Sequence, residues 1–271
     1  MLQVILLSKN LMADERRSLL IEYLTKHQRA TVKELSLELQ VSEATLRTDL
    51  NMLEDEGILR RIHGGAVLAQ QTVPAGSSFS FSAREKKNIG EKAAIGQKAM
   101  DYLQEGQCIM IDASTTALEL AKSLKRTQIK LTVITSGIYT ALELKDNPYL
   151  HVILIGGVLR MGSGAIEGTL GAGILGEVRA DLLFTSPAGY KPDSGLMDFN
   201  VYEVELKRKM VESADRVIAL IDSSKFNVGS IASYAQSGKI HDVITDTGTP
   251  PEMIRQLEES GIRVSTVKAQ R

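Results

Sequence analysis

The stretch from Thr31 to Ala66 constrains the fold more than any other part of the chain, because it joins two short helical patterns to a basic hairpin. Thr31 and Glu34 form a capping-box pattern, which predicts the start of a short helix. Ser42 is a second cap, and it predicts a helix over Glu43–Glu56 that ends at a glycine. Only two residues separate the predicted helices, so they must cross steeply, which is the geometry of a helix-turn-helix.

In a helix-turn-helix, the first turns of the second helix enter the major groove of DNA. Arg47 can bind a guanine edge or a phosphate, and Ala44 and Thr45 can contact a thymine methyl group or a phosphate. The following Arg61-Ile62-His63-Gly64-Gly65-Ala66 reads as a hairpin wing beside that helix. The alternative is an ordinary three-helix bundle, which the basic hairpin disfavours. The predicted DNA-contacting residues are Ser42, Glu43, Ala44, Thr45, Arg47, Thr48, Arg60, Arg61, His63 and Gly64.

The overall charge gives no support to DNA binding. The chain has a net charge of −1, and residues 1–70 carry nine Lys and Arg against ten Asp and Glu. DNA binding must therefore depend on where the positive side chains lie. A protein that coats DNA without sequence preference relies on abundant cations, so the near-neutral charge argues against that class.

After residue 83 the sequence alternates between apolar strands and helices, which predicts an α/β domain with a mostly parallel sheet. A charged amphipathic helix is predicted over Arg84–Leu103. The predicted domains are an extension (1–12, with Met12 as an alternative start), a winged helix-turn-helix (13–69), a linker (70–83) and an effector-sensing α/β domain (84–271). The predicted strands are Cys108–Ile111, Leu131–Ile134, Val152–Ile155, Leu182–Phe184, Val217–Ile221 and Val243–Thr245. Further helices are predicted over Thr115–Leu124, Ile138–Leu144, Val204–Ser213 and Pro251–Ser260.

Polar and small residues gather where the predicted strands end, and open parallel sheets bind ligands beyond the carboxyl ends of their strands. Hydroxyl groups, backbone N–H groups at helix starts and a lysine suit a phosphate, while carboxylates suit sugar hydroxyls. We therefore predict a site for a phosphorylated sugar or polyol. Its expected residues are Asp112, Ser114, Thr115, Thr116, Thr135, Ser136, Gly156, Gly157, Arg160, Glu203, Asp222 and Lys225.

Both halves resemble the DeoR family of bacterial transcriptional regulators. In the first half the resemblance rests on the run Ser42–Leu50 and on Arg61–Ala66. In the second half it rests on Asp112–Thr116, Gly156-Gly157 with Gly168, Ala180-Asp181, Gly195, Glu203–Lys207 and Asp222–Phe226. The resemblance implies a sensor domain folded like ribose-5-phosphate isomerase and the coenzyme A transferases. It implies a repressor of a carbohydrate or polyol catabolic operon, controlled by a phosphorylated metabolite.

The chain departs from the family pattern at three places. Thr48 stands where the family usually has a second arginine, Ser114 stands for a glycine, and Ser136-Gly137 stands for Asn-Ser. The segment Gly195–Phe199 followed by Glu203 is most similar to the glycerol-3-phosphate-repressor branch. These departures predict a different operator sequence or effector from the family norm.

The rival hypothesis is an enzyme, a phosphosugar isomerase fused to a DNA-binding module, in which Asp112, Glu203, Asp222 and Lys225 act as acid, base and electrostatic stabiliser. No histidine falls among the strand-end residues and no spacing predicts a metal site, so we expect no catalysis, metal or cofactor. The lone Cys108 is expected in the core of a cytoplasmic protein, and no apolar run reaches the roughly 20 residues that span a bilayer. Paired DNA half-sites predict a homo-oligomer, either a dimer or a tetramer.

Overall fold

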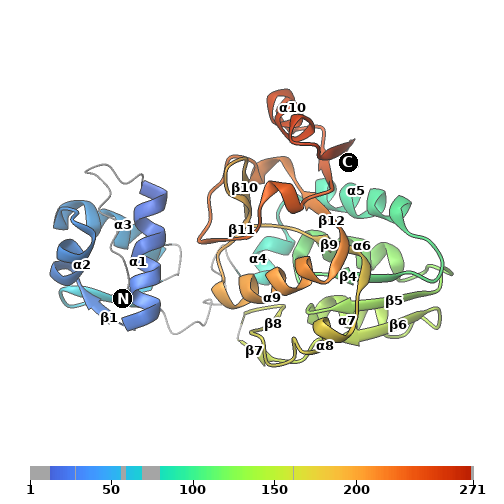
Figure 1. The fold of residues 1–271 in the computed structure, drawn as a ribbon, viewed down its shortest axis with the longest axis horizontal. Helices are drawn as coiled ribbons and strands as arrows, with labels where there is room; N and C mark the ends of the chain where they lie inside the picture. The colour runs from blue at the N-terminus through green and yellow to red at the C-terminus, as the bar shows by residue number, and fades with distance from the viewer. Residues whose placement is uncertain (1–12, 28, 56–58, 69–79, 161, 270–271) are drawn as a thin grey trace. The chain divides into compact units, whose positions relative to one another are not determined.

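The computed structural model describes residues 13–27, 29–55, 59–68, 80–160 and 162–269, which fall into two compact units (Figure 1). Unit 1 comprises Met1–Phe79 and unit 2 comprises Ser80–Arg271. The predicted extension 1–12, the glycine stop at residue 57 and residues 70–79 of the predicted linker lie outside the described residues.

Unit 1 combines a helix-turn-helix with a three-stranded antiparallel sheet of strand order β1-β3-β2, in which β1 precedes the helix-turn-helix and β2 and β3 follow it. The predicted capping box is present, since Thr31 Oγ1 accepts from Glu34 N at 3.1 Å and Glu34 Oε2 accepts from Thr31 N at 2.7 Å. Gln40, in the turn between the helices, has a φ of 53°. The elements are α1 (Ala13–His27), β1 (Arg29–Thr31), α2 (Val32–Leu39), α3 (Glu43–Asp55), β2 (Leu59–Ile62) and β3 (Gly65–Leu68).

The core of unit 1 is made of leucines from all three helices and the first wing strand. Leu46, Leu50 and Leu53 of α3 are buried, and they share the core with leucines of α1, α2 and β2. Asp49, on the same helix, is also buried, and its Oδ1 accepts from Arg16 Nη2 of α1 at 3.0 Å. This ion pair fixes α3 against α1, while Ala44, Arg47 and Thr48 on the outer face of α3 are exposed to solvent.

Unit 2 is built on a seven-stranded, wholly parallel sheet with strand order β15-β14-β12-β9-β4-β5-β6. The predicted mostly parallel sheet is confirmed. Its strands are β4 (Cys108–Ile111), β5 (Leu131–Thr135), β6 (Leu150–Leu154), β9 (Ala180–Thr185), β12 (Ala214–Ile221), β14 (Asp242–Asp246) and β15 (Arg263–Val267). The small strands are β7 (Val158–Leu159), β8 (Ile166–Glu167), β10 (Gly189–Lys191), β11 (Gly195–Asp198) and β13 (Ala232–Ala235).

Helices cover both faces of the large sheet. The helices α5, α6 and α7 contribute to one apolar core, while α8, α9, α10 and the sheet β10-β11-β13 contribute to the other. α5 and α6 lie side by side (Figure 1). The α-helices are α4 (Phe81–Glu85), α5 (Ile89–Ala99), α6 (Thr115–Leu124), α7 (Ile138–Leu144), α8 (Ile174–Glu177), α9 (Val201–Glu212) and α10 (Pro251–Glu259), and the short 3-10 turns are Met100–Tyr102, Ser223–Lys225 and Ser237–Lys239.

The predicted single helix over Arg84–Leu103 is wrong. The structure has α4, a corner, α5 and a short 3-10 turn in its place, and α4 begins at Phe81, inside the predicted linker. The corner lies at Asn88, whose φ of 53° is left-handed, and Asn88 Nδ2 donates to Asp222 Oδ1 at 2.9 Å. A tertiary contact therefore holds a conformation that ends one helix and begins the next.

The order of the strands determines where polar side chains meet. After β4 the chain adds β5 and β6 on one side, and it later adds β9 on the other side of β4. The carboxyl ends of β4 and β9 therefore lie at the point where the strand order reverses, where open α/β sheets bind ligands. Asp112 follows β4 directly, and Ser186 follows β9 directly.

Candidate functional sites

The amino-terminal half of α3 presents polar side chains to solvent. Ala44, Arg47 and Thr48 are exposed, and Arg47 Nη2 pairs with Glu43 Oε2 at 2.8 Å. The hydroxyl groups of Ser42 and Thr45 lie 2.8 Å apart, and Ser42 Oγ also accepts from Thr45 N at 3.2 Å. The predicted DNA-reading positions thus share one end of one helix, where Ser42 caps the helix and Arg47 is the exposed cation.

The predicted wing residues differ in their surroundings. Arg60, His63 and Gly64 are exposed, and Gly64 has the positive φ of 75° that the tight turn between β2 and β3 requires. Arg61 is half-buried, and its guanidinium donates to Gly65 O at 3.2 Å and to Asn51 Oδ1 at 2.6 Å. Arg61 therefore joins the wing to α3, whereas Arg60 and His63 point to solvent.

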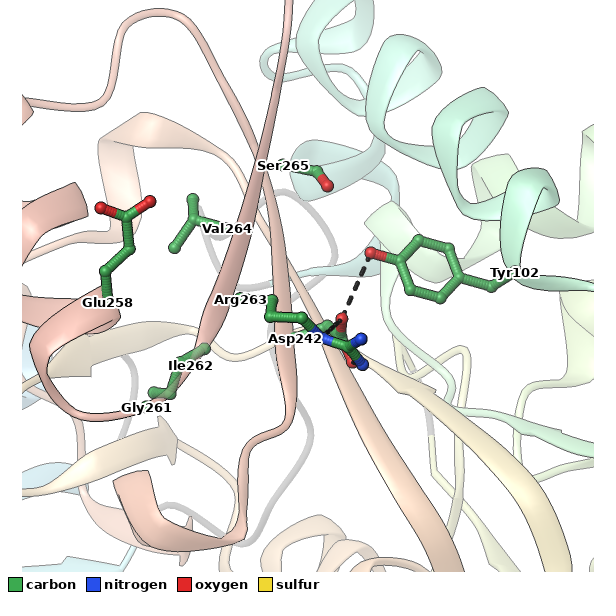
Figure 2. Close-up of a pocket in the computed structure, with 8 residues that line it drawn as sticks. All are labelled: Tyr102, Asp242, Glu258, Gly261, Ile262, Arg263, Val264 and Ser265. Atoms are coloured by element: carbon green, nitrogen blue, oxygen red, sulfur yellow. Dashed lines mark hydrogen bonds and ion pairs between the residues drawn. The ribbon is translucent and has the colours of Figure 1, made fainter.

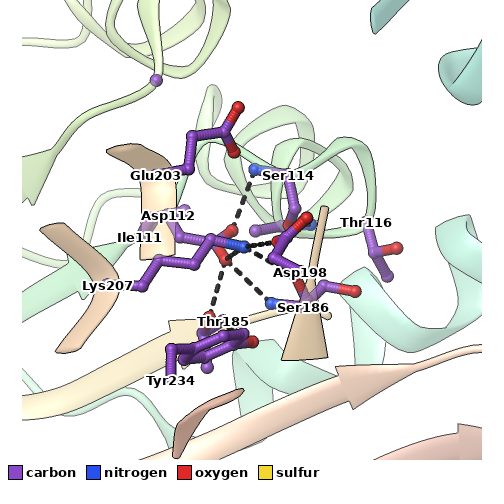
Figure 3. A network of polar contacts seen from close by, with 12 residues as sticks. Ile111, Asp112, Ser114, Thr116, Thr185, Ser186, Asp198, Glu203, Lys207 and Tyr234 are labelled. Carbon is purple, nitrogen blue, oxygen red and sulfur yellow. Dashed lines mark hydrogen bonds and ion pairs between the residues drawn. The ribbon is translucent and has the colours of Figure 1, made fainter. Parts of the chain in front are cut away.

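At the carboxyl edge of the large sheet in unit 2, Asp112 is completely buried and both of its oxygens are engaged (Figure 3). Oδ1 accepts from Ser114 N at 2.9 Å, and Oδ2 accepts from Thr185 Oγ1 at 2.7 Å and from Ser186 N at 2.9 Å. Burial alone raises the pKa of Asp112, but Lys207 and these donors outweigh it, so the pKa lies below its ordinary value. Asp112 is thus an ionised carboxylate with no free base function.

Lys207 reaches between two buried carboxylates (Figure 3). Its Nζ lies 3.0 Å from Asp112 Oδ2 and 2.7 Å from Asp198 Oδ2, and it donates to Ser186 O at 3.0 Å. Although burial lowers the pKa of Lys207, Asp112 and Asp198 raise it well above its ordinary value. We call Asp112, Thr185, Ser186, Asp198, Lys207 and Tyr234 the carboxyl-edge network; Tyr234 Oη lies 3.0 Å from Thr185 Oγ1.

Two further lysines adjoin this network. Lys225 Nζ donates to Ser186 Oγ at 2.8 Å and to Thr116 Oγ1 at 3.2 Å, and it lies 3.3 Å from Asp222 Oδ2. Lys92 Nζ donates to Thr115 Oγ1 at 3.1 Å. Since Thr115 and Thr116 open α6, whose cap is Ser114, both lysines lie at a helix N-terminus. We call Lys92 and Lys225 the lysine pair.

A second polar group extends from the start of α9 to the β7–β8 hairpin. Asn200 Nδ2 donates to Glu167 Oε1 at 2.7 Å and to Glu203 Oε1 at 3.2 Å. Arg160 Nε lies 3.0 Å from Glu167 Oε2, and its guanidinium lies over the Tyr202 ring at 4.2 Å from the centroid. We call Arg160, Glu167, Asn200 and Glu203 the glutamate corner. Its amide and carboxyl groups suit the hydroxyl groups of a polyol.

Burial raises the pKa of Glu203 to about 7, with Asp198 adding to the effect and Lys207 and Arg84 opposing it. Because this pKa lies above that of an unfolded glutamate, folding takes up a proton, and the free energy of unfolding falls as pH rises from about 4.5 to 7. We expect Glu203→Gln to remove that fall, which is on the order of 2–3 kcal/mol. Urea titrations at pH 5, 6, 7 and 8 measure it.

Glu205→Gln is the matched control for this prediction, since Glu205 lies two residues further along α9 and is exposed. It should keep the pH dependence of the wild type. A Glu203→Gln protein whose stability still falls over this pH range would contradict the assignment of the buried proton to Glu203.

The other predicted effector residues build turns. Thr135 Oγ1 donates to Ile111 O at 2.7 Å and accepts from Gly137 N at 3.0 Å, while Ser136 O accepts from Ile166 N at 2.8 Å. A side chain at Gly157 would meet Glu167 O at 2.7 Å, and a side chain at Gly171 would meet Gly156 O at 2.2 Å. These residues therefore set the path of the loop that carries Arg160 and Glu167.

Nine polar residues at these sites were not in the predicted set. Three of them are Thr185, at the end of β9, and Glu167 and Asn200 of the glutamate corner. Asn88 and Lys92 lie in the run Arg84–Leu103, which was predicted as one charged amphipathic helix. Asp198 and Tyr234 lie on the small antiparallel sheet β10-β11-β13, which was not predicted from the sequence. Ser186 directly follows β9, and Lys207 lies on α9. Lys207 belongs to the run Glu203–Lys207, which is one of the segments that resemble the DeoR family. That resemblance is the sequence signal for Lys207, because the spacing of residues alone does not indicate a functional role for it.

The described part of unit 2 also has an open depression of about 600 Å³ at the opposite end of the sheet (Figure 2). Its polar floor is Asp242, the first residue of β14, whose carboxylate accepts from Tyr102 Oη at 3.5 Å and pairs with Arg263 Nε at 3.0 Å and Arg216 Nη2 at 2.7 Å. Because the depression lies at the amino ends of the strands, it is separate from the carboxyl-edge network.

Within the described ranges, no three His, Cys, Asp or Glu side chains are grouped so that they could hold a metal ion. The helices described are all too short or too polar to cross a membrane.

Comparisons with known proteins identify both units. Residues 16–72 match the DeoR-like helix-turn-helix domain, and residues 87–247 match the DeoR C terminal sensor domain. The HTH-type transcriptional regulator GolR of Listeria innocua is 42% identical over 92% of this chain and 97% of its own length. The L-fucose operon activator of Haemophilus influenzae is 32% identical over 91% and 97%, and the HTH-type transcriptional regulator GlpR of Haloferax volcanii is 32% identical over 92% and 96%.

Among solved structures, ribose 5-phosphate isomerase A from Neisseria gonorrhoeae covers 50% of this chain and 52% of its own, at 12% identity and a TM-score of 0.37. The chain thus spans about half the length of that enzyme, and the likeness carries no argument about activity. The two matched domains and the full-length relatives are those of regulators. The chain therefore belongs to the DeoR family, and it is a DNA-binding transcriptional regulator and not an enzyme.

Proposed function

We propose that this protein represses a carbohydrate or polyol catabolic operon and that a phosphorylated sugar or polyol controls it through unit 2. The observation that carries the proposal is the position of the lysine pair, at the N-terminus of α6 beside the point where the strand order reverses. A helix N-terminus that carries lysines and hydroxyl groups suits a phosphate. The name of one relative, the L-fucose operon activator, supports an effector of the sugar class.

In this proposal the predicted effector residues divide by role. Lys225, Thr115 and Thr116 bind the phosphate with the backbone that follows Ser114, while Glu203 and its neighbour Asn200 bind hydroxyl groups. Asp112 and Asp222 hold the cations in place, since Asp112 pairs with Lys207 and Asp222 pairs with Lys225. Thr135, Ser136, Gly156, Gly157 and Arg160 position the loops at the rim.

On the DNA side, we propose that α3 enters the major groove with Ala44, Thr45, Arg47 and Thr48 facing the bases. Arg60, His63 and Gly64 on the wing lie beside the phosphate backbone. Two copies of the chain, in a dimer or a tetramer, read paired half-sites, because linking two modules raises affinity without any new contact.

The proposed phosphate site is tested by replacing Lys225 with methionine. A panel of phosphorylated sugars and polyols, each paired with its unphosphorylated form, is titrated calorimetrically into the wild type and the variant. We expect binding of a phosphorylated compound to the wild type and at least a tenfold loss of affinity in Lys225→Met, because a charge-assisted hydrogen bond contributes about 1.5–3 kcal/mol.

Lys239→Met is the matched control. Lys239, like Lys225, is the last residue of a short 3-10 turn, but it is exposed. The control should bind as the wild type does. Equal affinity of all three proteins would show that the phosphate binds elsewhere, and silence of the wild type across the panel would reject a phosphorylated effector.

A further inference from the structure

The edge of the large sheet at β6 carries most of the exposed large apolar side chains of unit 2. The described part of unit 2 has ten such side chains, and seven of them lie between residues 139 and 170. Six of these seven lie on β6 or on the chain just before and after it. We call these six the edge patch: Tyr139 and Leu142 on α7, Tyr149 in the turn before β6, Leu154 on β6, and Val158 and Leu159 on β7.

The edge patch is large enough to form the centre of a stable interface. Its residues are between 38% and 58% exposed, so together they leave on the order of 500 Å² of surface in contact with water. Monomeric proteins rarely expose a contiguous apolar patch of more than a few hundred Å², whereas each partner in a standard protein–protein interface buries roughly 800 Å². The edge patch, with the polar atoms around it, therefore matches one side of such an interface.

The backbone of β6 can accept a further strand. β6 is the last strand at one edge of the large sheet, with β5 on its inner side (Figure 1). Ile155 N, at the end of β6, donates to Thr135 O at 2.8 Å, so the odd-numbered residues of this strand bond to β5. The residues between them direct their N–H and C=O groups to the other side of the strand. Val152 and Leu154 therefore each present a donor and an acceptor at the outer edge.

The two edges of the large sheet differ in how they meet water. Edge strands are ordinarily protected from pairing by charged residues, by proline or by bulges. β15, at the opposite edge, has the sequence Arg-Val-Ser-Thr-Val, in which Arg263 and Thr266 are exposed. β6 has the sequence Leu-His-Val-Ile-Leu, its register with β5 is unbroken, and its Leu154 is 45% exposed. Of these two edges, β6 is the one whose sequence favours pairing with another strand.

A second copy of the chain is the partner that fits this edge. A strand that pairs with its own copy across a two-fold axis runs antiparallel to it. With the axis beside Ile153, Val152 of each copy pairs with Leu154 of the other, and the outward N–H and C=O groups of both residues are all satisfied. The side chain of Val152 packs in the same core as α7, so these pairs and α7 share one face of the sheet. Since the edge patch carries no charged residue, the two copies do not repel each other there.

We propose that β6 pairs with β6 of a second copy of this chain, which joins the two large sheets into one across a two-fold axis beside Ile153 and buries the edge patch of both copies. This inference rests on the proposed function in one respect, because paired DNA half-sites call for two copies. It names the surface through which unit 2 holds the two copies together.

Sedimentation velocity of the full-length protein over a concentration series tests this surface. We expect the wild type to form a dimer or a larger assembly, and Leu154→Lys to reduce that assembly to half its size. The association should weaken by at least about a hundredfold, because each dimer loses two buried leucines and gains two lysines at its centre. Leu142→Lys, on α7, is the second variant if Leu154→Lys does not fold by circular dichroism.

Thr266→Lys is the matched control, since Thr266 is an exposed residue of β15, the opposite edge strand. It introduces the same charge at a sheet edge that the inference leaves in water. The control should assemble as the wild type does.

Disulfide formation tests the register of the two strands. The single cysteine of the chain is first removed by Cys108→Ser, and one cysteine is then introduced into β6. Ile153→Cys brings two Cα atoms to roughly 4.5 Å across the axis, so mild oxidation should give a covalent dimer. His151→Cys leaves the two Cα atoms about 13 Å apart, which is beyond the reach of a disulfide, so this variant should stay unlinked.

Different outcomes reject different parts. A wild type that stays monomeric over the whole concentration series rejects the two-copy arrangement of the proposed function, and this inference with it. Equal assembly of the wild type and Leu154→Lys overturns this surface and leaves the two-copy arrangement standing. Equal cross-linking of Ile153→Cys and His151→Cys, or cross-linking of neither, overturns the pairing of β6 with its copy.

Discussion

Replacing Lys207 with methionine is expected to lower the free energy of unfolding of unit 2 by about 3–5 kcal/mol, because it leaves two buried carboxylates without their cation. Asp112 and Asp198 are 0% and 3% exposed, and both pair with the same Nζ. Methionine matches the length of the lysine stem, so packing is largely kept and the loss reports the charge. Urea unfolding followed by tyrosine fluorescence measures it, since six of the seven tyrosines lie in unit 2.

The pH dependence of the stability of Lys207→Met tests whether the loss of stability comes from the buried carboxylates. Without Lys207 the pKa of Asp112 should rise relative to the wild type, since burial raises it and only the donors Ser114, Thr185 and Ser186 still lower it. The variant should therefore regain stability relative to the wild type as the pH falls and the buried carboxyls are protonated. Lys209→Met, an exposed lysine two residues further along α9, is the control. If the free energy of unfolding of Lys207→Met at pH 7 fell by less than about 1 kcal/mol, the buried carboxylates of Asp112 and Asp198 would not depend on Lys207, and the prediction would be wrong.

Replacing Arg47 with alanine is expected to weaken operator binding by roughly 1–3 kcal/mol per DNA-binding unit if Arg47 reads a base. If two DNA-binding units bind paired half-sites, the loss of operator binding free energy would be twice as large. In the free protein the Arg47 side chain is 58% exposed and pairs with the partly exposed Glu43, so its release costs little. Electrophoretic mobility shift or fluorescence anisotropy, with the natural promoter region and with random DNA at one fixed salt concentration, measures the change.

Arg47→Lys distinguishes the two ways in which Arg47 can contact DNA. Lysine keeps the charge but lacks the planar fork that matches a guanine edge, so a base contact is lost in both variants. A phosphate contact would survive in Arg47→Lys, and its loss in Arg47→Ala would weaken operator and random DNA alike. Operator affinity that is unchanged in Arg47→Ala would reject any direct role for this residue.

The sequence was sufficient to predict the elements whose signals are local. Thr31 and Glu34 are three residues apart, and the capping box that they form in the structure is the one their spacing predicts. The apolar runs of β4, β12 and β14 likewise predict buried parallel strands by composition alone. At the strand ends the sequence also indicated that Asp112, Asp222 and Lys225 lie at one edge of the sheet, because parallel strands bring their carboxyl ends together.

The sequence was insufficient where a conformation depends on distant residues. The run from Arg84 to Leu103 contains no proline and keeps a helical pattern, yet the chain turns at Asn88 because Asp222 and Ser224 accept hydrogen bonds from its side chain. Lys92 and Lys207 could likewise not be distinguished by spacing in the sequence, since each lies among other charged residues on a helix. Only the packing of α5 and α9 against the sheet separates these buried lysines from their solvated neighbours.

Two residues of the carboxyl-edge network, Asp112 and Lys207, are each held in one charge state. Asp112 already accepts from Ser114, Thr185, Ser186 and Lys207, and the ammonium group of Lys207 is held between two anions. Neither group has a proton to give or a lone pair to spare at neutral pH, so Asp112 and Lys207 do not act as an acid or a base. In the proposed function these two residues therefore hold the shape of the effector site and take no part in chemistry on the metabolite.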